Sequence, residues 1–154
     1  YIKFMDHHQS IELCPETQVL TLFKKRSFMS KKIMIVDDSP MMRLAIRSGL
    51  QEAGYSVVEA VHGLDALAKL QAGDKINLII CDVNMPEMDG ITCTRSLISL
   101  MKNKTIPEIP IICCSANDSQ SDVEACKESG MSAFISKPLT IKKVQTILDV
   151  LLVK

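Results

Sequence analysis

The sequence predicts an α/β fold, a doubly wound parallel sheet with helices on both faces. From Lys31 onward, short apolar runs alternate with amphipathic stretches, which gives five β-α repeats in about 124 residues. Most of the apolar runs carry no alternating polar residues, as expected for central strands that are covered on both faces. The chain has 154 residues, of which 47% are hydrophobic and 23% charged, a balance typical of one globular domain.

Five apolar runs are expected to form the strands of this sheet. They are short, as buried strands of parallel sheets usually are, and glycine or polar turn residues separate them from the stretches that follow. The expected strands are Lys32–Val36, Ser56–Glu59, Leu78–Cys81, Ile109–Cys114 and Ala133–Ile135.

Helices are expected between and after these strands, because capping and stop signals flank the amphipathic stretches. Ser39 followed by Pro40 is an N-cap and first-turn pair, and Thr140 is the cap of the last helix. Gly54, Gly73 and Gly130 are stop signals. The expected helices are Pro40–Ala53, Gly63–Gln71, Gly90–Met101, Asp118–Ser129 and a last helix from Thr140 to about Leu152.

Residues 1–30 differ from the rest, because they show no sustained helical or strand period. We expect an N-terminal tail or linker there, disordered or derived from cloning, with weak support for a short helix over Ile11–Phe23. A basic cluster, Lys24–Arg26, closes this stretch and is interpreted as solvated. Residues 31–154 form the predicted domain.

Composition excludes several classes of function. A formal net charge of zero argues against nucleic-acid binding, and no apolar stretch has the length of a membrane span or the layout of a signal peptide. The cysteines form no CxxC pair and no zinc spacing, so we expect reduced core residues and a cytoplasmic protein. They are Cys14, Cys81, Cys93, Cys113, Cys114 and Cys126.

Chemically active residues follow four of the expected strands. Asp37 and Asp38 follow the first strand, Asp82 the third, Ser115 the fourth and Lys137 the fifth. Each alone is most simply a cap, a turn residue or a surface lysine. Because parallel strands end at one edge of the sheet, however, these side chains are expected to converge where such folds bind ligands.

Three carboxylates that lie close together repel one another and need a positive charge nearby. Two carboxylates about 4 Å apart repel by roughly 4 kcal/mol at an effective dielectric constant near 20. Mg²⁺ relieves this repulsion and prefers few carboxylates, retained waters and a phosphoryl oxygen. Lys137 and Ser115 could pair with other phosphoryl oxygens. The set therefore favours phosphoryl chemistry, with Asp82 as a nucleophile that forms an acyl phosphate.

At these residues the chain resembles the receiver domains of response regulators in two-component signal transduction. The matching motifs are Ile33-Met34-Ile35-Val36-Asp37-Asp38-Ser39, the stretch Leu78–Gly90 containing Cys81-Asp82-Val83-Asn84-Met85-Pro86, and Ser136-Lys137-Pro138. The resemblance covers about residues 31–154 and implies a flavodoxin-like (βα)5 fold with strand order 2-1-3-4-5.

The resemblance implies a role for each matching site residue. Asp82 would accept a phosphoryl group from a phosphohistidine. Asp38, Asp82 and the main-chain carbonyl of Asn84 would bind Mg²⁺ directly, with Asp37 acting mainly through water. Lys137 would contact the phosphoryl group.

Two further positions match the family's switch residues. Ser115 stands where the hydroxyl, often threonine, turns toward the phosphoryl group. Phe134 stands at the aromatic switch position, often tyrosine, and without a hydroxyl it could act only by packing.

The expected function is a signalling switch that catalyses only its own phosphorylation and dephosphorylation. Its partners would be a histidine kinase or histidine phosphotransfer protein and a downstream protein bound by the surface of Asp118–Ser129, Ala133–Ile135 and Thr140–Leu152. We expect no output domain after the last helix, so output would be protein binding or lie upstream. Direct nucleic-acid binding and membrane insertion are not expected.

Three alternatives differ in class or context. The chain could be the receiver of a hybrid histidine kinase that passes phosphate onward. A Mg²⁺-dependent phosphohydrolase of the haloacid-dehalogenase type needs Asp-x-Asp after the first strand, which adjacent Asp37-Asp38 does not supply. A flavodoxin-like FMN carrier needs a hydroxyl- and glycine-rich loop there, and the two aspartates would repel the flavin phosphate.

Overall fold

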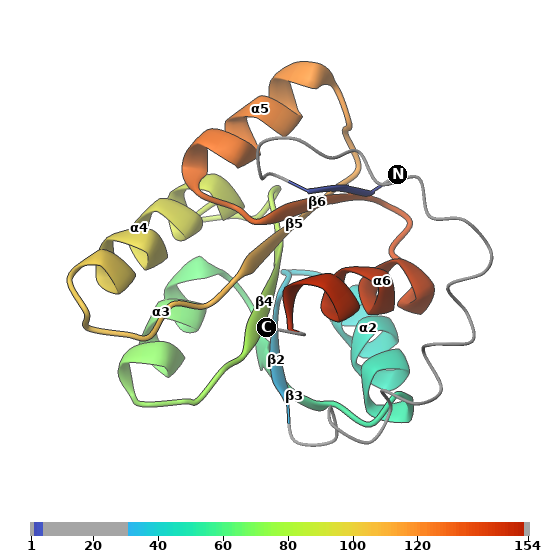
Figure 1. Cartoon of the computed structure of the whole chain (residues 1–154), viewed down its shortest axis with the longest axis horizontal. Coiled ribbons are helices and arrows are strands. Elements are labelled where there is room, and N and C mark those ends of the chain that lie inside the picture. Colours follow the sequence, from blue (N-terminus) through green and yellow to red (C-terminus); the bar gives the residue numbers. More distant parts are fainter. Residues whose placement is uncertain (1, 5–30, 153–154) are drawn as a thin grey trace.

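The computed structural model describes residues 2–4 and 31–152, which form one mixed sheet covered by five helices (Figure 1). The strands are β1 (Ile2–Phe4), β2 (Lys32–Val36), β3 (Ser56–Ala60), β4 (Leu78–Asp82), β5 (Ile111–Ser115) and β6 (Ala133–Ser136). The helices are α2 (Pro40–Glu52), α3 (Gly63–Gln71), α4 (Gly90–Lys102), α5 (Gln120–Ser129) and α6 (Ile141–Leu151).

The sheet has the predicted topology. Its order is β1-β6-β5-β4-β2-β3, and the neighbouring pairs from β3 to β6 are all parallel. Counted without β1, the five parallel strands stand in the order 2-1-3-4-5, so the predicted fold is confirmed. The order reverses between β2 and β4, and the first and third predicted strands therefore lie side by side.

The capping signals are also confirmed, with small shifts at the element ends. Ser39 and Thr140 are the N-caps of α2 and α6, and Gly130 ends α5 in a left-handed conformation at φ 99°. The helix predicted from Asp118 begins at Gln120, because the side chain of Ser119 accepts the N–H of Asp122 and acts as the cap. The strand predicted from Ile109 begins at Ile111, after Pro110.

Strand β1 was not predicted. Ile2–Phe4 lies in the segment expected to be tail or linker, and it pairs antiparallel with β6 at the edge of the sheet. Three residues are too few to show a strand period, so the pattern gave no signal. The helix predicted over Ile11–Phe23 lies outside the described residues.

Two hydrophobic layers hold the helices on the sheet. Helices α3, α4 and α5 cover one face, and α2 and α6 cover the other (Figure 1). Alternate residues of one strand enter opposite layers: Met34 and Val36 pack under α3–α5, whereas Ile33 and Ile35 pack under α2 and α6. This two-sided burial explains why the central strands are continuous apolar runs.

The five cysteines in the described residues are free and buried, as predicted. Cys113 on β5 and Cys126 on α5 bring their sulfur atoms to 2.9 Å, so this thiol contact helps to join the helix to the sheet. Burial raises the pKa of the Cys114 thiol to about 12, which keeps it protonated and uncharged in the core. Cys14 lies outside the described residues.

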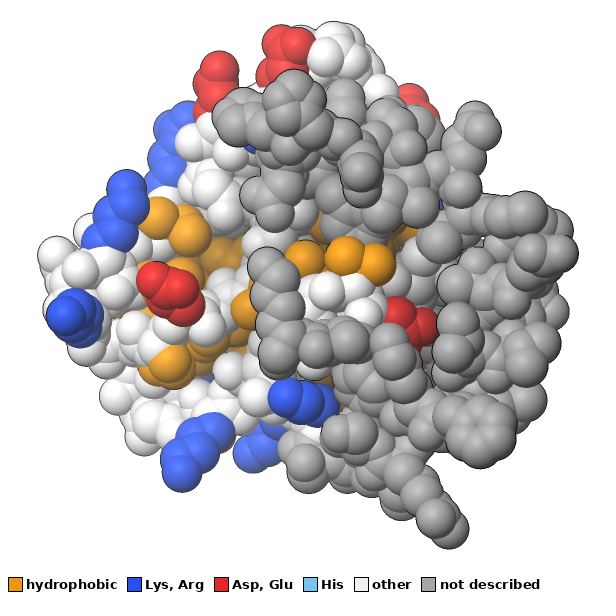
Figure 2. Space-filling model, in the orientation of Figure 1, with side chains coloured by type: hydrophobic (Ala, Val, Ile, Leu, Met, Phe, Trp, Pro, Cys, Tyr) orange, Lys and Arg blue, Asp and Glu red, His pale blue; other side chains and the backbone are white. Residues whose placement is uncertain are grey.

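Basic and acidic side chains are both scattered over the visible described surface (Figure 2). This mixture fits the formal net charge of zero. Within the described residues, none of the helices is both long and apolar enough to span a bilayer.

One glycine limits how α4 approaches the sheet. A Cβ atom at Gly90 would lie 2.8 Å from the Cα of Val83 and would also clash with the main-chain oxygen of Asp82. The N–H of Gly90 donates to the carbonyl of Val83 at 2.9 Å, which holds the start of α4 against the end of β4.

We therefore expect Gly90→Ala to lower the free energy of unfolding by about 1–3 kcal/mol, because backbone atoms cannot yield as a side chain can. Urea unfolding measures the change. Gly49→Ala is the matched control, since the atoms nearest its Cβ would be side-chain atoms of Ile141 at 3.3–3.4 Å. Equal effects of the two substitutions would contradict this account of Gly90.

Candidate functional site

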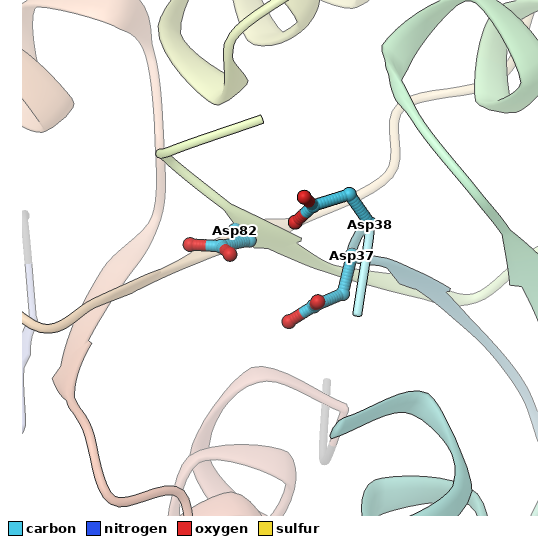
Figure 3. Close-up of side chains that lie close together, drawn as sticks. All are labelled: Asp37, Asp38 and Asp82. Atoms are coloured by element: carbon cyan, nitrogen blue, oxygen red, sulfur yellow. The ribbon is translucent and has the colours of Figure 1, made fainter. Parts of the chain in front are cut away.

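Three carboxylates meet where β2 and β4 end. Asp82 is the last residue of β4, and Asp37 and Asp38 follow β2 directly (Figure 3). One oxygen from each of the three lies within 4.8 Å of the others. Asp37 and Asp82 are 3% and 5% exposed, whereas Asp38 is exposed to solvent. The predicted convergence of these acids is found, with one side open to water.

Main-chain donors orient the two buried carboxylates. The N–H of Ser39 donates to Asp37 Oδ1 at 2.8 Å, and the N–H of Asn84 donates to Asp82 Oδ1 at 3.3 Å. In each case the side chain of an aspartate accepts the main-chain N–H of the residue two positions later, a turn that aspartate often forms where a strand ends. One oxygen of each carboxylate is thus held by the loop, and the other faces the ammonium of Lys137.

Lys137 supplies the positive charge. Its Nζ donates to Asp82 Oδ2 at 2.9 Å and lies 3.8 Å from Asp37 Oδ2. Burial alone would lower the pKa of this amine, but the hydrogen bond to Asp82 and the charges of Asp82 and Asp37 outweigh it and raise the pKa. Lys137 therefore remains a cation inside the site.

The pKa of Asp37 is raised in the folded protein. Burial raises the pKa of its carboxyl group, and the nearby charges of Asp82 and Asp38 raise it further. The N–H of Ser39 and the charge of Lys137 act in the opposite direction without cancelling the rise. The ionised form is therefore less stable in the folded protein than in water.

The donor set fits a hard divalent cation. Three carboxylates against one ammonium leave an excess of negative charge, and all the donors are oxygen atoms. Mg²⁺ suits such a site because it keeps several waters, and the exposed side at Asp38 leaves room for them. The residues present are therefore able to hold this ion.

The two remaining predicted residues, Ser115 and Phe134, lie on the strands β5 and β6. Ser115 ends β5, is 3% exposed, and its Oγ accepts the N–H of Asn117 at 3.1 Å. Its carbonyl accepts the N–H of Lys137 at 2.8 Å, which fixes the lysine's main chain beside β5. Phe134 lies within β6, fully buried in the layer under α3–α5.

Sequence reasoning missed Arg43. Its guanidinium donates to the main-chain carbonyl of Asp37 at 2.7 Å and to Glu59 on β3 at 3.2 Å. Arg47, one turn along α2, also pairs with Glu59 at 2.6 Å. The spacing of the two arginines indicated a shared helix face. Only the fold shows that Arg43 also stabilises the loop after β2, which contains Asp37 and Asp38.

Residues 33–149 match the family described as "Response regulator receiver domain". Among curated proteins, the chemotaxis protein CheY1 of Helicobacter pylori is 36% identical over 122 residues, covering 79% of this chain and 96% of CheY1. The hybrid signal transduction histidine kinase L of Dictyostelium discoideum is 34% identical over 119 residues, which cover 76% of this chain and only 7% of that kinase.

Solved structures agree with this assignment. The chemotaxis protein CheY4 of Vibrio cholerae superposes with a TM-score of 0.71 at 30% identity, covering 79% of this chain and 98% of that one. The CheX-CheY-BeF3-Mg+2 complex from Borrelia burgdorferi gives 0.71 at 31% identity, covering 80% and 90%. On its sequence, its fold and its acidic site, this chain belongs to the response regulator receiver domain family of two-component signal transduction.

Proposed function

We propose that the chain is a phosphoacceptor switch in which Asp82 takes a phosphoryl group from a phosphohistidine, with Mg²⁺ held by the neighbouring acids. Receiver domains are signalling switches rather than ordinary enzymes, and the chain would catalyse only its own phosphorylation and dephosphorylation. The observation that carries the proposal is the contact of Lys137 with Asp82 inside a triad of carboxylates.

Asp82 is the best nucleophile of the three acids. Asp38 is exposed, and Asp37 has a raised pKa that disfavours its ionised form. Asp82 is buried, one of its oxygens accepts the N–H of Asn84, and the other faces the ammonium of Lys137. An oxygen fixed beside a cation can attack phosphorus while the cation meets the phosphoryl oxygens.

The proposed reaction transfers one phosphoryl group. A carboxylate oxygen of Asp82 forms the new P–O bond as the P–N bond to the donor imidazole breaks, and the imidazole leaves with the bonding electron pair. Bound Mg²⁺ would supply charge neutralisation for the phosphoryl oxygens. Asp38, Asp82 and the carbonyl of Asn84 would hold it directly, and Asp37 through water. A similar solved structure, from Borrelia burgdorferi, is described as holding BeF3 and Mg²⁺.

The phosphoryl group would act as a signal through β5 and β6. Ser115 ends β5 and would turn its hydroxyl toward the phosphoryl oxygens, while Lys137 directly follows β6. The ammonium would exchange part of its contact with Asp82 for the phosphoryl group, which links the site to Phe134 and the surface of α5, β6 and α6. A downstream protein would bind there, as CheX is named with CheY in the Borrelia complex.

The donor would be a histidine kinase or a histidine phosphotransfer protein. Likeness to a hybrid kinase favours a second context, in which the domain passes its phosphate onward to another histidine. Transfer from the phosphorylated chain to a purified histidine phosphotransfer domain would distinguish this relay from a terminal switch. The buried free thiols support a reducing compartment, and hence the cytoplasm, for either context.

We expect acetyl phosphate with Mg²⁺ to add the mass of one phosphoryl group to the wild-type chain and none to Asp82→Asn, which lacks the nucleophilic oxygen. Intact-mass analysis measures the addition. Asp74→Asn is the control, because this exposed acid lies in the loop before β4. Phosphorylation of Asp82→Asn to the same extent as wild type would refute the assignment, because the phosphoryl group would then lie on another residue.

Lys137→Ala is expected to lower the rate of phosphorylation by about 10- to 100-fold, since one charge-assisted hydrogen bond is worth roughly 1.5–3 kcal/mol. The affinity for Mg²⁺ should stay the same or rise, because a nearby positive charge is removed. Mass analysis over time and a Mg²⁺ titration separate the two effects. Lys142→Ala, an exposed lysine on α6, should change neither; a parallel loss of Mg²⁺ affinity in Lys137→Ala would count against its proposed role.

In the absence of Mg²⁺, Asp37→Asn is expected to raise the free energy of unfolding at neutral pH. The raised pKa means that ionised Asp37 destabilises the folded state, and this cost disappears as the pH falls through that pKa toward the ordinary value of 3.8. Urea unfolding at several pH values should show the advantage of Asn shrinking in acid.

Mg²⁺ should reverse the order of stability. At a hundred times its dissociation constant, a ligand of the folded state adds about 2.7 kcal/mol. Wild type should gain this stabilisation, whereas Asp37→Asn should gain less. Asp74→Asn again serves as the control, and equal Mg²⁺ stabilisation of all three proteins would show that Asp37 takes no part in the metal site.

A further inference from the structure

Strand β6 would be an edge strand if β1 were absent. It pairs with β5 on one side and with β1 on the other, and among the described strands β1 has no further neighbour. All four residues of β6 are buried, with Ala133, Phe134 and Ile135 at 0% exposure and Ser136 at 8%. A buried strand with an open row of main-chain donors and acceptors is a template for pairing with another segment.

The usual protections of an edge are absent from β6. Natural edge strands carry charged side chains, proline or a bulge that discourage pairing. The sequence Ala133-Phe134-Ile135-Ser136 contains no charge and no proline, and its register with β5 is continuous. At the opposite edge, β3 places the charged side chain of Glu59, which is engaged by Arg43 and Arg47. The two edges of this sheet are therefore built differently.

Strand β1, which covers the outer edge of β6, differs from the other strands in its direction. Among the described strands β1 alone runs antiparallel, with Ile2 opposite Ile135, Lys3 opposite Phe134 and Phe4 opposite Ala133. Ile2 packs against the hydrophobic layer under α2 and α6, so the contact includes an apolar side chain as well as main-chain pairing. With three residues, β1 offers few ladder hydrogen bonds and little buried area, which favours a contact that opens and closes.

We propose that the outer edge of β6 is a strand-addition site, and that the chain's own segment Ile2–Phe4 occupies it reversibly and shields it from extended segments of other chains. Strand addition derives its affinity from main-chain hydrogen bonds and its selectivity from alternate side chains. Here an apolar residue in the position of Ile2 is the selective feature. This inference goes beyond the proposed function, because phosphoryl transfer to Asp82 needs no occupant at this edge.

Attachment within one chain explains how so short a strand can hold its place. A tethered segment has an effective concentration in the millimolar range, so pairing too weak to survive between separate molecules persists within one. A competing segment must therefore be present at a comparable concentration or carry additional contacts to α5 or α6. A partner segment would thus displace β1 only if it bound this edge of β6 more tightly than β1 does.

The test is amide hydrogen exchange on the full chain. In the triple variant Ile2→Pro, Lys3→Pro, Phe4→Pro, no residue of the segment retains an N–H, so strand pairing fails. Within residues 133–136, the amides that face β1 should exchange about tenfold faster or more, because they lose their strand partner, whereas those that face β5 keep theirs. Exchange in Leu78–Asp82 of β4 should not change, which shows that the variant remains folded.

Two comparisons make the result decisive. The variant Ile2→Val, Lys3→Thr, Phe4→Tyr keeps every donor and favours strands, so it should exchange like wild type. A synthetic peptide with the sequence of residues 1–8, at millimolar concentration, should restore protection in the triple-proline variant, and a scrambled peptide should not. Unchanged exchange in the triple-proline variant, or equal action of the native and scrambled peptides, would overturn the proposal.

Discussion

The repulsion among Asp37, Asp38 and Asp82 is the constraint on which the functional end of this molecule depends. A parallel sheet with reversed strand order brings the ends of β2 and β4 together, and the chain places acids at both. Carboxylates at this separation destabilise one another unless a cation joins them. Lys137 neutralises part of the charge, and the remaining excess of negative charge on oxygen atoms fits a divalent cation. The repulsion within the cluster and its fit to a cation thus have one origin, the excess of carboxylates.

The neighbouring structure keeps the acids from relaxing apart. Gly90 allows the start of α4 to touch the main chain of Asp82 and Val83, and Arg43 ties the carbonyl of Asp37 to Glu59 on the next strand. The Ser115 carbonyl holds the main chain of Lys137 in the same way. Contacts to the main chain therefore hold three loops of the site in place.

Strand β6 joins two regions of the molecule. Residues in the middle of β6 are buried under helices, while its end leads directly to Lys137, so the strand connects the acidic site with an outer edge of the sheet. That edge differs from β3, where Glu59 forms ion pairs with α2. The edge at β3 thus carries a charge paired with helix α2, whereas the edge at β6 is apolar and is covered by the three residues of β1.

Sequence alone determined the layered architecture, because burial on both faces leaves continuous apolar runs and helix ends carry local signals. Lys32–Val36 and Gly63–Gln71 were predicted with their observed bounds, and Ser39, Thr140 and Gly130 act as the caps and stop that their chemistry suggests. The convergence of Asp37, Asp38, Asp82 and Lys137 also followed from sequence, since parallel strands must end at one edge.

Only the tertiary structure decided which oxygen atoms meet Lys137, that Arg43 braces the acid loop, and that Ile2–Phe4 completes the sheet. A cap or a strand period is recorded in neighbouring residues. These contacts, by contrast, join segments far apart in the chain, and their geometry depends on how whole layers pack, which no local pattern records.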